Sequence, residues 1–250
     1  ISFKYKEQNL QLRIQKPFRR KMMSTHPLTT ATRAVGLFGA ALVLYWVYHF
    51  REGMAMSSEI RLRIFNVHPV ISFVGLILLN GEAMLAYKTA SGGKTLKPAV
   101  HIGAQGVALC LGAAGVWAVY KFHRLKGVDD FYSLHSWLGL ACLFVHSLQW
   151  VVGFATFWYP GGSVNRKAAV LPWHASLGLY AYALGVAASL TGILEKAAFM
   201  HHHNIMSHYS SEAVYLNFLG MVIVVLAGLV AYAGTVGPFS DKNGSYLPVR

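Results

Sequence analysis

The chain has 250 residues, of which 55% are hydrophobic and only 12% are charged. That charged share is about half of what soluble proteins carry, yet 22 Lys and Arg against 9 Asp and Glu give a net charge of +13. A nucleic-acid-binding protein would carry basic residues along one face or helix; here the long central segments almost lack them, which argues against a nucleic-acid partner. The two cysteines lie in apolar runs without a CxxC partner, which argues against a disulfide framework or a zinc site.

Six apolar segments follow one another along the chain. They cover residues 34–50, 67–87, 100–122, 133–159, 169–193 and 213–235. Most reach the ~20 residues that cross a bilayer core, and a bilayer forces backbone groups to pair within each segment, so we expect helices. The first segment is short, but no A-x-A site follows it, which favours a retained helix over a cleaved signal peptide. We therefore predict an all-α membrane protein with six transmembrane helices.

The two ends of the chain differ from this apolar part. Residues 1–32 form a basic N-terminal tail, and within it residues 1–21 are expected to be disordered or not native. Residues 33–238 are expected to form the transmembrane domain and residues 239–250 a C-terminal tail. Counts of Lys and Arg favour a cytoplasmic N-terminus by 15 to 7, but without residues 1–21 the inside count falls to 8 and the bias nearly vanishes.

Four histidines occupy equivalent positions in the second to fifth segments. His68, His101, His135 and His174 each lie about one turn inside the start of a segment, separated by 33, 34 and 39 residues. Because neighbouring helices run in opposite directions, His68 can face His135 near one membrane surface. By the same argument His101 can face His174 near the other surface.

Two imidazoles on opposite sides of one haem iron fill both axial positions, which favours electron transfer over oxygen chemistry. Small residues that would leave room for a flat macrocycle lie nearby, at Gly75, Gly103, Gly106, Gly139 and Gly178. For any single histidine the alternative is an interhelical hydrogen bond. For the set, the alternative is a transition-metal transporter that uses the histidines directly, although such a site would normally add carboxylates or thiolates.

The remaining polar residues of the segments give weaker signals. Glu82 lies well inside a helix, where it could relay protons or pair within the bundle. His146 is expected to be packed rather than to bind metal, and residues 201–203 to lie in a solvated loop. His123 falls on the same side as His68 and His135, where it could contact a substrate.

Three motifs around the paired histidines resemble those of the cytochrome b561 family, especially its plant members. They are Phe131-Tyr132-Ser133-Leu134-His135-Ser136-Trp137-Leu138-Gly139, Val67-His68-Pro69-Val70 and Pro172-Trp173-His174, with Gly192-Ile193-Leu194-Glu195-Lys196 as a further match. The resemblance implies a central bundle of helices 2–5 that holds two haems b. It assigns His68 and His135 to the non-cytoplasmic haem and His101 and His174 to the cytoplasmic haem, with the N-terminus in the cytoplasm.

The resemblance also implies a function. Cytosolic ascorbate would deliver one electron at a time across both haems to monodehydroascorbate or a ferric chelate on the far side, which makes the chain an ascorbate-dependent transmembrane oxidoreductase. A homodimer in the lipid bilayer is implied in the same way. Family members occur in vacuolar and plasma membranes, of which we favour the vacuolar membrane.

Substrate residues are implied on both sides of the membrane. The expected cytoplasmic ascorbate site consists of Lys88, Lys94, Lys97, Arg166 and Lys167. Here Pro98 replaces a lysine that is usual in the family, and Lys97 stands beside it. Lysines near a haem edge would attract the ascorbate monoanion, although each could instead be a positive-inside residue. His123 matches the residue that meets the acceptor on the far side.

Overall fold

The computed structural model describes residues 25–90 and 95–235, and in this part of the chain every regular element is helical. The expectations for residues 1–21, Lys94 and residues 239–250 lie outside the described residues. The elements in chain order are α2 (Thr25–Tyr45), η1 (Trp46–Phe50), α3 (Arg61–Ser72), η2 (Phe73–Leu79), α4 (Asn80–Thr89), α5 (Leu96–Lys126), α6 (Leu134–Gly153), η3 (Phe154–Trp158), α7 (Val164–His202) and α8 (Ser211–Thr235), where η marks π-helical turns that continue a helix.

Six of the described helices are long and apolar enough to cross a membrane, which confirms the predicted number. They span Pro27–Phe50, Arg61–Thr89, Leu96–Lys126, Leu134–Trp158, Val164–His202 and Ser211–Thr235, with mean hydropathy between 1.4 and 2.4. Several extend beyond the predicted segments, because hydrophobicity marks the hydrocarbon core whereas backbone hydrogen bonding continues into polar sequence. The expected loop at residues 201–203 is therefore wrong for His201 and His202, which belong to the last turn of α7.

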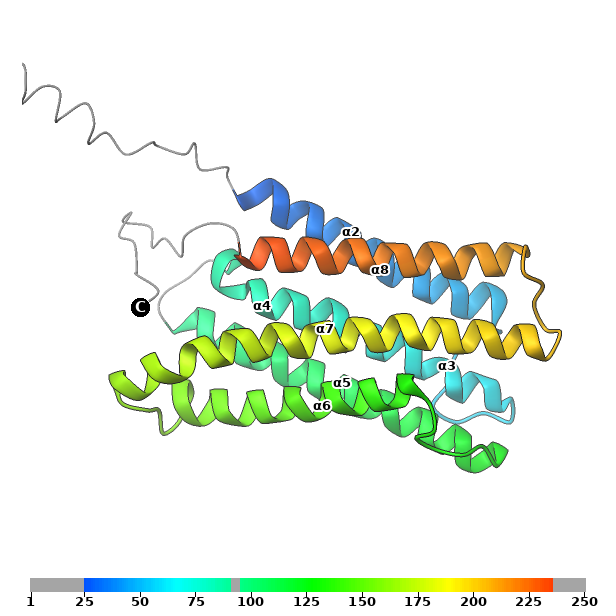
Figure 1. Ribbon diagram of the computed structural model, residues 1–250, viewed down its shortest axis with the longest axis horizontal. Coiled ribbons are helices and arrows are strands. Elements are labelled where there is room, and N and C mark those ends of the chain that lie inside the picture. The colour runs from blue at the N-terminus through cyan, green and yellow to red at the C-terminus, as the bar shows by residue number, and fades with distance from the viewer. Residues whose placement is uncertain (1–24, 91–94, 236–250) are drawn as a thin grey trace, which may run out of the picture.

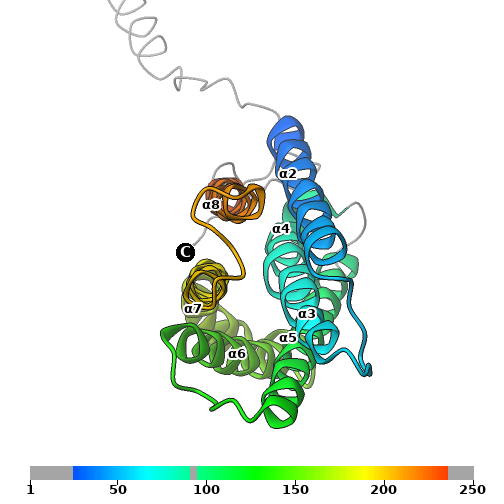
Figure 2. The same cartoon turned by 90° about the vertical axis from the view of Figure 1, so that its right-hand side faces the viewer.

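The helices run up and down side by side along the long axis of the molecule (Figure 1). Seen from one end, α3, α4, α5, α6 and α7 follow one another around the bundle, while α2 and α8 pack against each other on one side (Figure 2). Helices 2–5 of the sequence analysis, α3–η2–α4, α5, α6–η3 and α7, therefore lie next to one another. This arrangement brings the starts of α3 and α6 to one end of the bundle and those of α5 and α7 to the other.

Local sequence explains how the second membrane helix changes its winding. Pro69 lies inside α3 and lacks a backbone N–H, so the helix cannot keep an unbroken α-type ladder there, and the π-helical η2 begins at Phe73. Within η2, Gly75 packs directly on α5: a Cβ at this position would lie 2.7 Å from Leu111 Cβ and 2.9 Å from the Ala108 carbonyl oxygen. The absence of a side chain thus allows close helix approach beside the histidines.

Ion pairs fasten α2 and its continuation η1 to the rest of the bundle at both ends. Near the start of α2, Arg33 pairs with Glu82 of α4 at 2.9 Å, so pairing within the bundle is the observed state of this acid. At the other end, Arg51 Nε donates to Glu212 Oε1 at 2.7 Å, and its Nη2 pairs with Oε2. Trp46 Nε1 donates to Glu212 Oε1 at 2.8 Å, so the carboxylate at the start of α8 is buried but fully paired.

Candidate functional site

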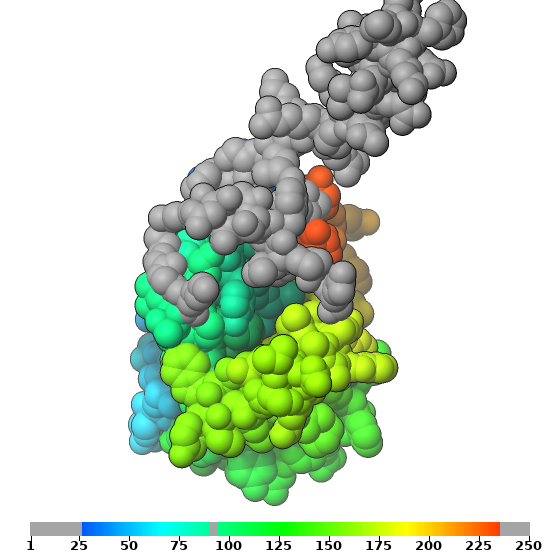
Figure 3. Space-filling model, turned by 90° about the vertical axis from the view of Figure 1, so that its left-hand side faces the viewer, coloured from blue at the N-terminus to red at the C-terminus, as the bar shows by residue number. Residues whose placement is uncertain are grey.

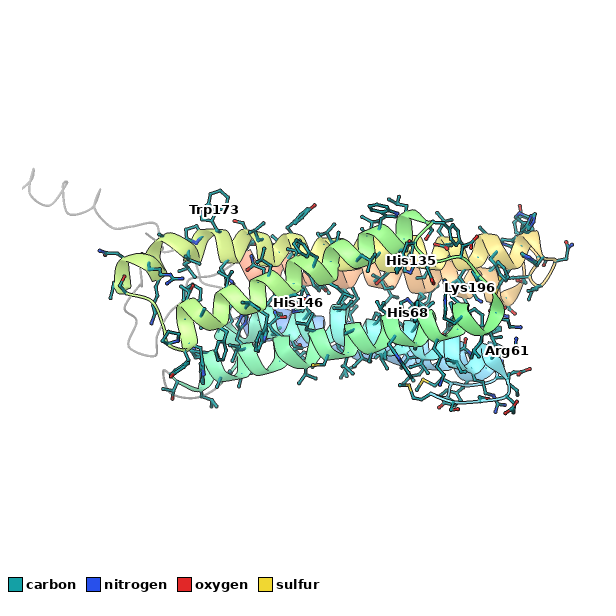
Figure 4. The ribbon with its side chains drawn as sticks, turned by 90° about the horizontal axis from the view of Figure 1, so that it is seen from below. Arg61, His68, His135, His146, Trp173 and Lys196 are labelled. Atoms are coloured by element: carbon teal, nitrogen blue, oxygen red, sulfur yellow. The ribbon has the colours of Figure 1, made fainter. Side chains whose placement is uncertain are left out.

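The four histidines of the second to fifth membrane helices meet in two pairs. The expectation that each lies about one turn inside its helix is wrong for His68 and His174, because α3 begins at Arg61 and α7 at Val164, in polar sequence ahead of the apolar segments. The rings of His68 and His135 have centroids 5.8 Å apart and are inclined by 81°, and Figure 4 shows them facing each other across the interior of the bundle. The rings of His101 and His174 have centroids 6.1 Å apart and are inclined by 71°. The structure thus brings together the residues that the antiparallel argument paired, one pair toward each end of the bundle.

Hydrogen bonds fix the orientation of three of these four rings. The Nδ1 atom of His68 lies 3.0 Å from the Gly115 carbonyl oxygen, that of His135 lies 2.8 Å from the Ala188 oxygen, and that of His101 lies 2.8 Å from the Ala83 oxygen. A proton on Nδ1 would be donated to each carbonyl, leaving Nε2 as the free electron pair that binds a metal.

His174 differs from the other three. Its Nδ1 is buried and has no hydrogen-bond partner among the described residues. The ring is held by packing instead: Phe157 lies 5.4 Å away between centroids, and a Cβ at Gly153 would come within 2.9 Å of His174 Cε1. One of the two pairs therefore lacks one of its two orienting hydrogen bonds.

The separation of the rings fits one metal ion between each pair. Two metal–nitrogen bonds of about 2 Å, placed in line with two imidazole ring radii of about 1.2 Å, put the centroids about 6.4 Å apart. The observed 5.8 Å and 6.1 Å lie close to this value. Among the described residues, the two rings of a pair make no hydrogen bond to each other. Their Nε2 atoms are therefore available to a ligand.

Space for a flat macrocycle is present beside the rings. A cavity of about 610 Å³ is lined by His68, His135 and Gly139 among other residues of α3, α5, α6 and α7. Gly139 follows His135 by four residues and Gly178 follows His174 by four, so each shares a helix face with its histidine. A Cβ at either glycine would meet no atom within 4 Å. These residues fit haem, the group that the sequence predicted.

The mouth of this cavity carries a polar cluster. His123 Nδ1 lies 2.9 Å from Asp130 Oδ1, while Arg124 pairs with Oδ2 of the same carboxylate. Both His123 and Asp130 line the cavity together with His68 and His135. Tyr132 donates to Glu195 Oε1 at 3.3 Å; desolvation and, after it, this carboxylate raise the pKa of the Tyr132 phenol, so the hydroxyl remains a hydrogen-bond donor.

The expected basic residues at the opposite end have different surroundings. Lys88 Nζ donates to the Ala233 and Gly234 carbonyl oxygens at the end of α8, at 2.7 Å each. Lys97 Nζ, which is exposed, donates to the Tyr87 oxygen at 3.1 Å.

Arg166 and Lys167 lie in the first turn of α7, where the Ser163 side chain caps the helix. This end of the molecule is shown in Figure 3, where the surface is hollowed between the α4–α5 segment in teal and the start of α7 in yellow-green. The basic residues of the two segments thus belong to the same end face of the bundle.

Two features of the site were missed by the sequence reasoning. The Arg51–Glu212 pair accepts a hydrogen bond from Trp46, which lines the cavity, and Lys196 also lines the cavity. A charged residue near the end of an apolar segment was the available signal, but sequence spacing did not connect α2, α7 and α8. His146 is only 4% exposed, as expected for a packed residue.

The sequence matches known proteins over most of its length. The family model for eukaryotic cytochrome b561 matches residues 67–200. "Transmembrane ascorbate ferrireductase 2" of Arabidopsis thaliana is 51% identical over 87% of this chain and 94% of its own length. "Ascorbate-specific transmembrane electron transporter 2" of Zea mays is 37% identical over 89% of this chain and 94% of its own length. "Transmembrane ascorbate ferrireductase 1" of Arabidopsis thaliana is 37% identical over 81% of this chain and 84% of its own length.

The helix arrangement, the paired histidines and these matches agree with the resemblance seen in the motifs. They also agree on a protein that crosses the membrane several times. The chain therefore belongs to the eukaryotic cytochrome b561 family, which consists of membrane proteins that bind haem b.

Proposed function

We propose that the chain transfers single electrons across a membrane, from ascorbate in the cytosol to monodehydroascorbate or a ferric chelate on the far side. His68 and His135 would hold one haem b, and His101 and His174 a second. The observation that carries the proposal is the presence of two imidazole pairs, 5.8 Å and 6.1 Å between centroids, toward opposite ends of one helical bundle. A bound haem supplies a reversible one-electron couple without a proton-transfer step of its own.

The names of the relatives support the redox reading over the metal transporter considered from sequence. They describe ascorbate ferrireductases and ascorbate-specific electron transporters. In the reaction that we propose, ascorbate loses one electron and one proton, and a ferric chelate gains one electron. With monodehydroascorbate as acceptor, one electron and one proton regenerate ascorbate. The transporter therefore stays the less favoured function.

At the donor end, the chain would bind an organic anion through its basic residues. Lys97, Arg166 and Lys167, together with Lys94, would attract the ascorbate monoanion, because fields of like-signed charge raise the local concentration of counter-ions. Lys88 of α4 would contribute to this field from beside the end of α8, where it donates to two carbonyl oxygens. We expect Lys97, whose hydrogen bond lies in exposed surroundings, to matter more for ascorbate than Lys88, whose hydrogen bonds are part-buried.

At the acceptor end, His123 would contact the acceptor or hand a proton to it. Its Nδ1 is 2.9 Å from Asp130 Oδ1, which fixes the ring and leaves Nε2 toward other partners. Arg124 pairs with the second oxygen of the same carboxylate, so Asp130 is held in place from two sides. This triad would act as an oriented proton donor and acceptor for monodehydroascorbate, and as a binding contact for a ferric chelate.

The proposed function also requires a defined orientation of the chain in a particular membrane. Residues 33–238 would form the functional domain, with the N-terminus in the cytosol and the protein in the vacuolar membrane as a homodimer. This orientation is supported by the resemblance to the family, since without residues 1–21 the counts of Lys and Arg on the two sides, 8 and 7, are nearly equal.

The test uses purified protein in liposomes loaded with ascorbate. We expect the protein to contain two haems with b-type reduced spectra, both reduced by internal ascorbate, and to reduce an external ferric chelate. Liposomes without protein, and liposomes without ascorbate, are the controls. Absence of haem after expression with a haem supplement would disprove the proposal, and flux of a divalent metal without any electron donor would favour the transporter.

A further inference from the structure

Lys196 is a cation on the wall of the cavity that holds the His68–His135 pair. It lies on α7 one turn after Gly192, where a Cβ would come within 2.8 Å of His135 Cε1. Its ammonium group rests on aromatic faces, with Nζ 4.4 Å from the Phe65 ring centroid and 5.5 Å from that of Phe199. Figure 4 shows Lys196 near this histidine pair, toward the adjacent end of the bundle.

The carboxylates around this cavity are engaged elsewhere. Glu212 is paired with Arg51 and accepts from Trp46. Asp130 is paired with His123 and Arg124, and Glu195 accepts from Tyr132. In the described part of the chain, no carboxylate oxygen lies within the 4.0 Å ion-pair distance of Lys196 Nζ, since the four ion pairs found there involve other residues.

Lys196 is half-buried, and a positive charge that is partly removed from water is stabilised by nearby anions or dipoles. The two aromatic rings supply part of this stabilisation, but they carry no net charge. Lys196 therefore has the surroundings expected of a lysine that pairs with a bound anion. The cavity that it lines, about 610 Å³, is the place where such an anion would lie.

We propose that Lys196 binds a propionate carboxylate of the haem held between His68 and His135. This inference rests on the proposed function, because it assigns one residue to a group that the function requires. Haem b carries two propionates, which are anions at neutral pH and would otherwise enter a partly apolar cavity unpaired. An anionic ferric chelate is a second group whose carboxylate would form the same ion pair with Lys196.

The first experiment compares Lys196→Met, Lys196→Arg and Lys121→Met in protein that carries both haems. Lys121 is the matched control, because its Nζ also rests on an aromatic ring, 5.2 Å from the Trp117 centroid, but it is not among the residues that line the cavity. We expect Lys196→Met to speed loss of one haem to an excess of apomyoglobin about tenfold. The midpoint potential of that haem should fall, since a nearby positive charge favours the reduced form. Lys196→Arg and Lys121→Met should leave both quantities close to those of the parent protein.

A second experiment separates the two sources of carboxylate. Apoprotein in detergent is loaded with haem b or with its dimethyl ester, in which both propionates are neutral. If Lys196 binds a propionate, the difference in haem loss between the parent protein and Lys196→Met disappears with the ester. An undiminished difference with the ester would overturn the proposal, as would a Lys196→Met variant whose haem loss and potentials are unchanged.

The third arm measures reduction of an anionic and a neutral ferric chelate by the same variants. A Lys196→Met defect confined to the rate with the anionic chelate would assign the lysine to the acceptor and overturn the haem assignment. These outcomes are distinct from failure of the proposed function, which would appear as parent protein without haem. They are also distinct from misfolding, because the second haem serves as an internal reference in every variant.

Discussion

The two ends of the bundle present the same pair of imidazoles in different surroundings. At the His68–His135 end, both Nδ1 atoms lie within hydrogen-bond distance of backbone carbonyls, and a cavity of about 610 Å³ adjoins the rings. At the His101–His174 end, only His101 has such a partner. The tilted rings of Tyr87 and Phe157 have centroids 5.5 Å and 5.4 Å from those of His101 and His174.

The order and direction of the helices determine which histidines meet. The neighbouring residues determine how each ring is oriented and what surrounds it. One histidine in each of four neighbouring antiparallel helices is enough to create both pairs. The carbonyl bonded to Nδ1 and the polar groups at the cavity mouth are local additions, and these set ligand strength and substrate contact. Substitutions of the histidines, which both ends share, and substitutions of their neighbours, which differ, should therefore have different effects on the two sites.

The largest expected effect comes from filling the space beside a histidine. Gly139→Leu should abolish haem binding at the His68–His135 pair, and Gly178→Leu should abolish it at the other pair, because the added side chain takes the room of the macrocycle. Gly228→Leu in α8 is the control, since a Cβ there also meets no atom within 4 Å but lies away from both pairs. Haem per protein, measured after purification, checks this; equal haem in all three variants would contradict the assignment of the space.

The ion pairs at the two ends should differ in their contribution to stability. The Arg51–Glu212 pair has side chains 9% and 11% exposed, whereas the Arg33–Glu82 pair is 49% and 29% exposed. Arg51→Met leaves a buried carboxylate without its partner, which we expect to cost roughly 3 kcal/mol of unfolding free energy. Arg33→Met should cost about 1 kcal/mol or less. Denaturant unfolding of the two variants side by side measures the difference, and equal losses would show that burial does not distinguish the pairs.

Loss of haem should begin at the end where His174 lacks a partner for Nδ1. A metal-bound histidine that makes this hydrogen bond holds its metal roughly ten times more tightly or better. During stepwise transfer of haem to apomyoglobin, we therefore expect the His101–His174 site to empty first. The remaining spectrum should match that of a His174→Ala variant. If it matches His135→Ala instead, hydrogen bonding at Nδ1 does not govern retention.

The smallest effects concern the substrates. Lys97→Ala should slow reduction by ascorbate by up to about tenfold at low salt and less at high salt, because it removes one charge from an attracting field. It should leave reduction of the acceptor by the prereduced protein unchanged. His123→Ala should show the opposite pattern. Stopped-flow measurements from each side test this, and slowing of the same half-reaction by both changes would contradict the separation of the two ends.

Much of this architecture could be predicted from the sequence because the signals are strong and local. Apolar runs gave the six helices, and one histidine near each of four helix starts was enough to predict which rings meet. Helix ends were less predictable, as His201 and His202 show, because hydropathy falls before the backbone hydrogen bonds do.

Contacts between distant segments could not be predicted in the same way. The Arg51–Glu212 pair joins residues 161 positions apart, and no periodicity connects them. The missing partner of His174 Nδ1 depends on which backbone carbonyls the neighbouring helices place beside the ring, which a pattern of residue types does not encode. Similarly, Lys196 could be located in a motif, but its lack of a carboxylate partner within the described chain became visible only once the surrounding acids were placed.

The most direct test of the central claim is the ratio of haem to protein in the parent chain, in His135→Ala and in His174→Ala. Two haems in the parent and one in each variant, with two different residual spectra, are the result that two independent bis-histidine sites predict. Two haems in either variant, or the same residual spectrum in both, would contradict the pairing of His68 with His135 and of His101 with His174.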